Sequence, residues 1–309
     1  MIRIPDDFVR QFSPADFLSN CHEAFAGYGN GTHRMEPREE EVRGSRYTLK
    51  MPASIPGYTG YKFIDEISDV STGRLGSKTA VIRLKPGSSE EVEMSAEYIT
   101  SMRTGAAGAL GVRYFAPYAR DISILGTGNV AKALALCVNE LDVRRINVYS
   151  RTSEKREKFK SEVQDLVGAE IILHDSQKSC IKTCDAILAA VPTLEPILSY
   201  DDFGCSYISC MGGDSRTAQL SEEMLFRPTI VPDNEAQCWR SGEFRRAIEK
   251  GREGDINFAM IGGRTANIGD AANGRLKLDG KVIAYFTGLA VQDMSAAKMI
   301  YERFTGSSL

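Results

Sequence analysis

The chain has 309 residues, of which 42% are hydrophobic and 26% charged, a composition typical of a globular protein with one large core or two ordinary ones. A net charge of −3 gives no bulk attraction for nucleic acid or an anionic membrane, and no apolar run approaches the roughly 18 residues of a membrane-spanning helix. The first twelve residues lack the apolar core of a signal peptide. We therefore expect neither a nucleic-acid nor a membrane partner.

The cysteines bear on compartment and metal binding. The chain has seven cysteines, an odd number, and they do not fall into closely spaced pairs. This favours a reducing cytoplasm over a framework of disulfides. Cys180 and Cys184 are four residues apart, but no third or fourth ligand stands near them. We predict a cytoplasmic protein without a metal site.

Residues 1–118 predict a mixed sheet with helices. Ser13 and Pro14 are typical of a helix start, and the polar stretch 27–44 predicts a loop or an edge strand. Strands with turn-rich segments between them are predicted at 45–51, 60–65, 78–85 and 91–94. A helix is predicted over 95–117, whose "GAAGALG" centre would let another backbone come close.

After Pro117 apolar strands alternate with amphipathic helices, which predicts βαβ units and a parallel sheet covered on both faces. The strands are expected at 121–126, 145–150, 170–175, 185–192 and 205–213. A helix after the first strand would place Val130, Leu134, Val138 and Leu141 on one face. Further helices are expected at 154–167 and 290–304.

The loop after the first of these strands has the spacing Gly126-x-Gly128-x-x-Ala131. The first glycine permits a tight turn, the second lets the backbone approach a pyrophosphate, and the alanine allows close helix–strand packing. The helix start supplies free N–H groups to the anion. We predict a dinucleotide site whose loop contacts come from Gly126, Thr127, Gly128, Asn129 and Val130.

The end of the second strand of this region indicates which cofactor binds. An acidic residue there would accept a hydrogen bond from a free ribose hydroxyl, but the sequence reads Ser150, Arg151, Thr152. A guanidinium grips phosphate, and Lys155 and Arg156 add positive charge nearby. The alternative is a solvated helix start. We expect NADP(H) to be preferred, with NAD(H) possible.

The three histidines, His22, His33 and His174, belong to no recognisable triad or metal motif. We therefore expect a lysine and an aspartate to serve as the catalytic acid and base. The order of "MRTGAAGAL", the glycine loop, "GGDSRTAQLSEEML" and "FTGLAVQDMSAAKMIYERF" resembles the ornithine cyclodeaminase/mu-crystallin family over nearly the whole chain. That family includes ketimine reductases and amino-acid dehydrogenases. The resemblance implies a Rossmann-type nucleotide domain (119–287) inserted in an α+β substrate-binding and dimerisation domain (1–118 plus 288–309), and a homodimer.

The resemblance also implies a substrate site. Arg46 and Arg103 match arginines that clamp the carboxylate of an α-imino or α-amino acid, and Lys62 matches the active-site lysine. Buried beside arginines, this amine would have a lowered pKa and could exchange protons near neutral pH. The alternatives are a surface ion pair for Arg46, a helix-face charge for Arg103 and a solvated strand lysine for Lys62.

Asp214 follows two glycines, at the carboxyl end of its strand if that strand belongs to the parallel sheet. It matches the catalytic aspartate of the family, which stabilises an iminium or relays a proton; an ordinary loop aspartate is the alternative. We further expect Thr104 at the cofactor phosphates, and Val191 and Pro192 beside the nicotinamide.

Two departures from the family pattern refine the expected activity. A common Lys-Ser-x-Gly stretch reads "YFTG" here (285–288), and residues 47–61 lack the acid that cyclodeaminases use for water attack. The main hypothesis is an NADP(H)-dependent reductase that delivers hydride to the C=N of a small α-imino or ketimine acid, or runs in reverse as an amino-acid dehydrogenase. The alternatives are an ornithine-cyclodeaminase-type lyase with recycled NAD and a non-catalytic NADP-dependent small-ligand-binding protein.

Overall fold

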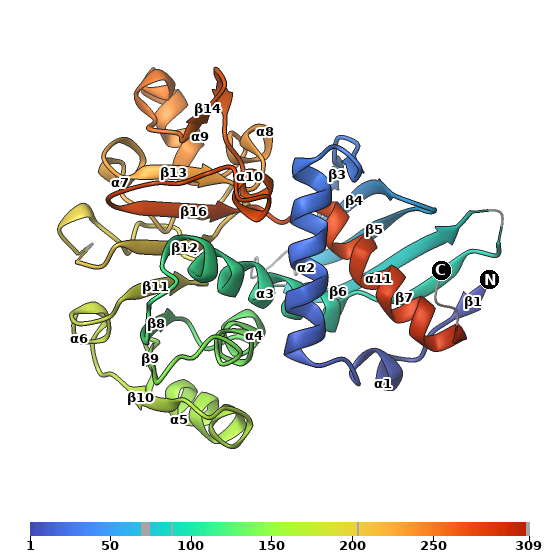
Figure 1. Cartoon of the computed structure of the whole chain (residues 1–309), viewed down its shortest axis with the longest axis horizontal. Helices are drawn as coiled ribbons and strands as arrows, with labels where there is room; N and C mark the ends of the chain where they lie inside the picture. The colour runs from blue at the N-terminus through green and yellow to red at the C-terminus, as the bar shows by residue number, and fades with distance from the viewer. Residues whose placement is uncertain (69–74, 88, 203, 307–309) are drawn as a thin grey trace. The chain divides into compact units, whose positions relative to one another are not determined.

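The computed structural model describes residues 1–68, 75–87, 89–202 and 204–306 (Figure 1). The chain forms two compact units, Met1–Arg103 with Leu289–Leu309, and Thr104–Gly288. We predicted the first boundary at residue 118; the division falls earlier, inside helix α3 (Glu97–Phe115). We call these parts the first and the second unit.

The first unit is built on a mixed sheet of order β1-β7-β6-β5-β4-β2, with β3 also pairing with β4. In the described strands of this sheet, β1 and β7 are parallel and the other pairs are antiparallel. The strands are β1 (Ile2–Arg3), β2 (Arg34–Met35), β3 (Glu39–Arg43), β4 (Arg46–Ile55), β5 (Tyr58–Ser68), β6 (Leu75–Pro86) and β7 (Val92–Ser95). The four strands predicted between turn-rich segments are therefore present, as β4, β5, β6 and β7.

The turn between β4 and β5 corrects one prediction. We expected residues 52–60 to be turn-rich, but Ile55 pairs with Tyr58, so only Pro56 and Gly57 form the turn. Gly57 has φ +79°, which a residue with a side chain rarely adopts. Of the other expected turn segment, 69–77, residues 69–74 lie outside the described residues and β6 begins at Leu75.

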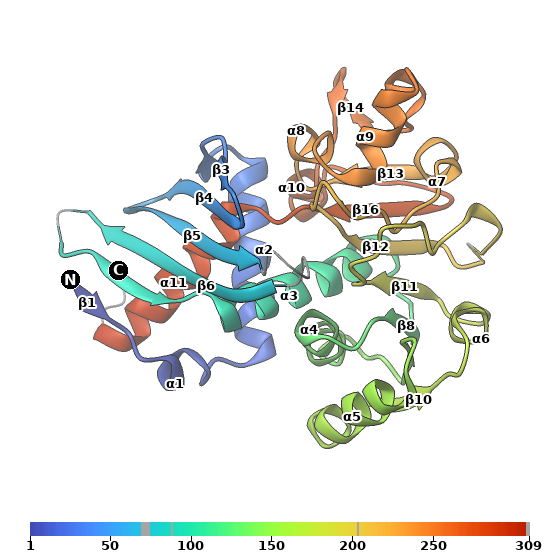
Figure 2. The same ribbon diagram turned by 180° about the vertical axis from the view of Figure 1, so that it is seen from behind.

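Two helices cover one face of this sheet, α2 (Pro14–Gly29) and α11 (Ala290–Thr305) (Figure 1). The predicted start of α2 is confirmed, because Ser13 and Asp16 form a reciprocal capping box. Every second residue of β4, from Leu49 to Ile55, is buried beneath α11. Figure 2 shows the opposite face of the sheet, and a short helix α1 (Asp6–Val9) precedes α2.

The second unit contains the predicted parallel sheet, of order β10-β9-β8-β11-β12-β16-β13. Its strands are β8 (Asp121–Leu125), β9 (Arg145–Tyr149), β10 (Glu170–Leu173), β11 (Ala186–Ala189), β12 (Tyr207–Met211), β13 (Thr229–Pro232) and β16 (Val282–Phe286). A separate antiparallel pair is β14 (Met260–Ile261) and β15 (Arg264–Thr265). Strand order reverses at β8, the arrangement of a Rossmann-type fold, in which ligands bind beyond the carboxyl ends of the strands.

Helices connect these strands. They are α4 (Asn129–Val138), α5 (Ser153–Val163), η1 (Gln164–Leu166), α6 (Gln177–Ile181), η2 (Tyr200–Asp202), α7 (Glu223–Phe226), α8 (Glu235–Cys238), α9 (Gly242–Glu249), η3 (Glu253–Asp255) and α10 (Ile268–Ala272). Leu141, expected on the face of α4, lies beyond its end. The predicted close approach in α3 is present, because a Cβ on Gly105 would lie 2.5 Å from the carbonyl of Ala133. Among the described residues, no helix is long and apolar enough to cross a membrane.

Candidate functional site

The glycine loop lies where strand order reverses. Gly126 has φ +114°, and a Cβ there would lie 2.6 Å from the carbonyl oxygen of Ala190, which follows β11. Only glycine therefore fits this turn. Gly128 is the N-cap residue of α4, which has no side-chain cap, and a Cβ on Gly128 would meet no described atom within 4 Å. Free helix N–H groups beside open space suit the pyrophosphate of a dinucleotide.

The predicted ribose-binding residues directly follow β9. Arg151 is exposed, and no described residue forms an ion pair with it. The Ser150 hydroxyl donates only a long hydrogen bond of 3.4 Å to the Thr152 carbonyl. Arg156 differs from our expectation of added free charge: it is buried, donates to the Ser150 carbonyl at 2.7 Å and pairs with Asp175 at 2.6 Å. Arg156 therefore holds the backbone of this turn, and Arg151 is the cation that a phosphate could reach.

The carboxyl ends of β11 and β12 carry the other predicted residues of this unit. Val191 is half-buried, Pro192 exposed, and Asp214 follows β12 after two glycines. Asp214 is partly exposed and forms a bidentate ion pair with Arg216, at 2.7 and 3.0 Å. The strand position expected for Asp214 is thus present, whereas its catalytic role stays a prediction.

A buried polar network supports this edge of the sheet. The Tyr285 hydroxyl donates to one Glu243 oxygen at 2.6 Å, and the other accepts the Gln219 N–H at 2.6 Å. The Gln219 side chain in turn accepts the Val191 N–H at 3.0 Å and donates to the Met211 carbonyl at 2.7 Å. Tyr285, the departure from the family pattern, therefore fixes the loops after β11 and β12 through Glu243.

The first unit contains a buried cluster of charges. Lys62 on β5 and Asp293 on α11 are 1% and 0% exposed, and the amine lies 2.8 Å from the carboxylate. Arg103 on α3, 9% exposed, is 3.3 Å from the other oxygen of Asp293. Two cations thus share one anion, which leaves the cluster with an excess positive charge.

The neighbouring charges and burial determine the pKa of the Lys62 amine. Burial, reinforced by the charges of Arg103 and Arg38 and opposed by Asp293, lowers the pKa of Lys62 to about 7. Burial alone would raise the pKa of Asp293, but Arg103 and Lys62 hold it below its ordinary value. An anionic carboxylate therefore lies beside an amine that is partly protonated near neutral pH.

Gln292 connects the cluster to the start of α11. Its side-chain oxygen accepts the Leu289 N–H at 2.9 Å and a hydrogen bond from Arg103 at 3.5 Å. Its amide nitrogen contacts the Cys21 sulfur at 3.2 Å, and burial raises the pKa of Cys21 to about 12. Cys21 is therefore a protonated packing group here.

The structure corrects the assignment of Arg46. It lies five positions along β4 from Met51, the register partner of Lys62, which is about 16 Å of strand. The odd spacing places Arg46 on the opposite face of the sheet. Its exposed guanidinium forms a bidentate pair with Asp65, at 2.6 and 2.8 Å. Arg46 is therefore a surface ion pair, the alternative that we considered.

Arg38 occupies the place expected of Arg46. The Glu36 N–H donates to the Pro52 carbonyl, and Glu39 is the strand register partner of Lys50. Arg38, between them, therefore lies beside β4 next to Met51. Its Nε atom is buried, and its charge lowers the pKa of Lys62. The sequence pattern of this stretch predicts only a loop or an edge strand.

Sequence reasoning also missed Asp293. A signal was present, because an acid in the small and apolar segment "AVQDMSAA" must be buried and then needs a cationic partner. Thr104, expected at the cofactor phosphates, is half-buried on α3 directly after Arg103. Among the described residues, no group of three or more His, Cys, Asp or Glu side chains could hold a metal ion.

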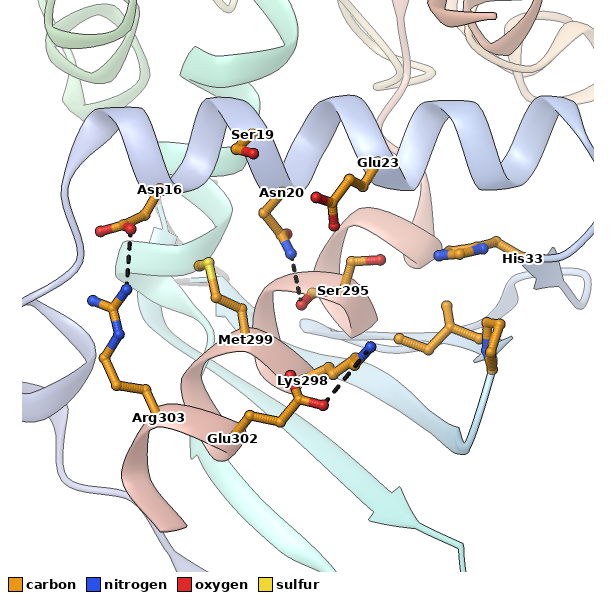
Figure 3. Close-up of a pocket in the computed structure, with 12 residues that line it drawn as sticks. Asp16, Ser19, Asn20, Glu23, His33, Ser295, Lys298, Met299, Glu302 and Arg303 are labelled. Atoms are coloured by element: carbon orange, nitrogen blue, oxygen red, sulfur yellow. Dashed lines mark hydrogen bonds and ion pairs between the residues drawn. The ribbon is translucent and has the colours of Figure 1, made fainter. Parts of the chain in front are cut away.

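A separate polar cavity of about 380 Å³ lies between α2 and α11 in the first unit (Figure 3). Asn20 donates to the Ser295 carbonyl at 3.0 Å across it, and Arg303 pairs with Asp16 at 3.0 Å. Its twelve described lining residues include none of the predicted site residues. It is therefore distinct from the charge cluster.

Comparison with known proteins places the chain in a family. The model of the ornithine cyclodeaminase/mu-crystallin family matches residues 6–308. The chain belongs to this family. The family membership that the sequence motifs indicated is thereby confirmed.

Individual members of the family extend the comparison. Alanine dehydrogenase from Archaeoglobus fulgidus is 29% identical over 98% of this chain and 94% of its own length. Delta(1)-pyrroline-2-carboxylate reductase from Bacillus cereus is 26% identical over 68% of this chain and 66% of its own length. The solved structure of an archaeal alanine dehydrogenase dimer with bound NAD has a TM-score of 0.85 at 23% identity, covering 100% and 97% of the two chains. The Rossmann-type fold class is therefore confirmed.

Proposed function

We propose that this protein is an NADP(H)-dependent reductase of a small α-imino or ketimine acid, or an amino-acid dehydrogenase in the reverse direction. The observation that carries the proposal is the buried amine of Lys62, with a pKa of about 7, between an anion and two arginines. The names of the two curated relatives, an alanine dehydrogenase and a pyrroline-carboxylate reductase, support the same substrate class.

Each residue of the cluster has a role in this proposal. Arg103 and Arg38 attract the substrate carboxylate, because their charges exceed the single charge of Asp293. Lys62 gives a proton to, or takes one from, the substrate nitrogen, since both protonation states are populated near pH 7. Asp293 orients the Lys62 amine. Asp214 remains the second proton-handling group that the family resemblance implies.

The cofactor proposal rests on the second unit. Gly126 and Gly128 form a loop that fits a pyrophosphate, and the exposed Arg151 offers its guanidinium to a 2′-phosphate. When bound, the nicotinamide would supply or accept the hydride. The solved archaeal alanine dehydrogenase holds NAD, so the comparison does not supply the preference for NADP(H). That preference is proposed for this chain on Arg151 alone.

We also propose a homodimer, as in the archaeal relative. Phe63 and Val81 are register partners on the sheet face opposite to Lys62, and both are only partly buried in the single chain. Light scattering at several concentrations would give twice the 34.0 kDa chain mass for a dimer. A constant monomer mass would contradict this part of the proposal.

The cofactor is tested by titrating purified protein with NADPH and NADH while following intrinsic and nicotinamide fluorescence. We expect tighter binding of NADPH, with the preference lost in Arg151→Ala. Lys158→Ala is the matched control, because Lys158 is an exposed cation on α5 that pairs with Glu162. NAD retained through purification, or tighter binding of NADH, would favour the lyase alternative.

The substrate site is tested by reduction of Delta(1)-pyrroline-2-carboxylate, and of pyruvate with ammonia. We expect Lys62→Ala to abolish turnover, whereas Lys50→Ala, on the opposite face of the sheet, leaves it unchanged. Arg38→Leu should raise KM strongly and Arg46→Leu should not. Ammonia release from ornithine without net NADH production would support the lyase, and full activity of Lys62→Ala would refute the proposed chemistry.

A further inference from the structure

Two cysteines face each other at the amino edge of the parallel sheet. Ala186 at the start of β11 pairs with Tyr207 at the start of β12. The same register, continued two residues back, places Cys184 opposite Cys205. Neighbouring strands lie about 4.8 Å apart, within the roughly 4.4–6.8 Å between Cα atoms that a disulfide needs.

The two thiols line the same cavity, shift each other's pKa and differ in character. Each sulfur donates a hydrogen bond to a backbone carbonyl, Cys184 to Ile181 at 3.4 Å and Cys205 to Tyr207 at 3.2 Å. The neighbouring Cys205 thiol is the main reason that the pKa of Cys184 is lowered although it is buried. The Cys184 thiol and burial raise the pKa of Cys205. Cys180, the other nearby thiol, has its pKa raised by burial to about 12. Cys184 is therefore the nucleophile of the cluster, since the thiolate is the reactive form.

A cavity gives small molecules access to this pair. It has a volume of about 390 Å³, and its lining includes Cys184, Cys205, Pro117 and Tyr118. Tyr118 is 87% exposed, so the cavity opens at the molecular surface. Both cysteines are unpaired thiols, 8% and 7% exposed.

We propose that Cys184 and Cys205 form a reversible thiol–disulfide pair that small peroxides oxidise through this cavity. The Cys184 sulfur attacks one peroxide oxygen, the O–O bond breaks, and the other oxygen leaves as water after taking a proton. The resulting Cys184 sulfenic acid is attacked by the Cys205 sulfur. The S–S bond forms, the S–O bond breaks, and the hydroxyl leaves as water with the proton of Cys205.

The two thiols thus lose two electrons and two protons, and one hydrogen peroxide becomes two waters. Transient disulfides of this kind are compatible with a reducing compartment, where thiols regenerate the reduced pair. The pair lies at the amino ends of β11 and β12, whereas the glycine loop and Asp214 follow carboxyl ends. The inference therefore does not depend on the proposed reductase activity.

The test is to treat the full-length protein with hydrogen peroxide, alkylate the remaining thiols and map the products by mass spectrometry. Trypsin leaves residues 183–216 as one peptide, because no lysine or arginine lies between Lys182 and Arg216. Further cuts before Asp185 and Asp201 and after Tyr207 place Cys184, Cys205 and Cys210 in separate peptides. We expect a 184–205 cross-link, a loss of two thiols from seven, and full recovery with dithiothreitol.

Variants identify the order of attack. Cys205→Ser should stop at a Cys184 sulfenic acid that dimedone traps, and Cys180→Ser should form the cross-link as the wild type does. Seven intact thiols after treatment, or a cross-link from Cys184 to Cys180 or Cys210, would overturn the proposal. The wild-type mapping decides this even if a variant fails to fold.

Discussion

Replacing Asp293 with asparagine should lower the pKa of Lys62 further. The substitution keeps the shape but removes the anion of the cluster, 2.8 Å from the amine, and leaves the positive charge of Arg103 beside it. A unit charge 4 Å away is worth about 4 kcal/mol at an effective dielectric constant of ~20. That equals about three pKa units, and water that enters around the neutral side chain would reduce the change. We therefore expect the pKa to fall from about 7 to well below it, by roughly one to three units.

The pKa can be measured by NMR on protein labelled at the lysine Cε carbon, following the chemical shift with pH. Lys62→Met identifies the signal because it removes that resonance alone. If Lys62 of the wild type titrates near its ordinary 10.5, or if its pKa rises in Asp293→Asn, the electrostatic argument is wrong. Because breaking a buried ion pair costs about 3–5 kcal/mol, the variant should be examined well below its unfolding temperature.

Three further outcomes follow from the structure. Gly126→Ala should lower the free energy of unfolding by about 1–3 kcal/mol, because of its positive φ and the contact with Ala190; an unchanged urea midpoint would contradict this. Tyr285→Phe should cost about 1.5–3 kcal/mol, since it leaves the buried Glu243 oxygen without its donor, and calorimetry would measure the loss. Between pH 7 and 9 the wild type should gain stability relative to Lys62→Met. The unfolded state binds more protons there, because the pKa of Lys62 is lowered on folding; a flat difference would refute the shift.

The nucleotide-binding half could be predicted because its determinants are local. The strand, the two glycines and the start of α4 lie within eighteen residues, from Asp121 to Val138, and each follows from backbone sterics or helix-end chemistry. Loop details such as the pairing of Arg156 with Asp175 could not be read in this way. They depend on which side chain folds back over the end of β9.

The mistake over Arg46 came from the hairpin register. Once Pro56 and Gly57 are recognised as a two-residue turn, Ile55 must face Tyr58, and Lys62 then faces Met51. Alternation along β4 puts Arg46 on the other face. The sequence pattern alone predicts a turn of nine residues here and therefore does not fix the strand register. Without the register, sequence alone could not tell that Arg46 lies five residues from the position opposite Lys62.

Asp293 could not be placed for a different reason. It is separated from Lys62 by 231 positions of sequence, and nothing local in α11 says which strand the helix will cover. The sequence indicates only that a carboxylate among small apolar residues needs a cation. Which lysine or arginine supplies it is settled by tertiary packing.

The separation of Lys62 from Asp293 has a consequence for biosynthesis. A ribosome makes β5 early, but α11, which covers the same sheet and carries the counter-ion, emerges only after all of 104–288 has been made. Until α11 is made, the apolar face of the first-unit sheet is uncovered and the Lys62 amine has no counter-ion. The contiguous second unit can already fold at that stage. We expect nascent chains stalled before residue 289 to show a protease-resistant second unit and a protease-sensitive first one, so that the Lys62 amine is desolvated last.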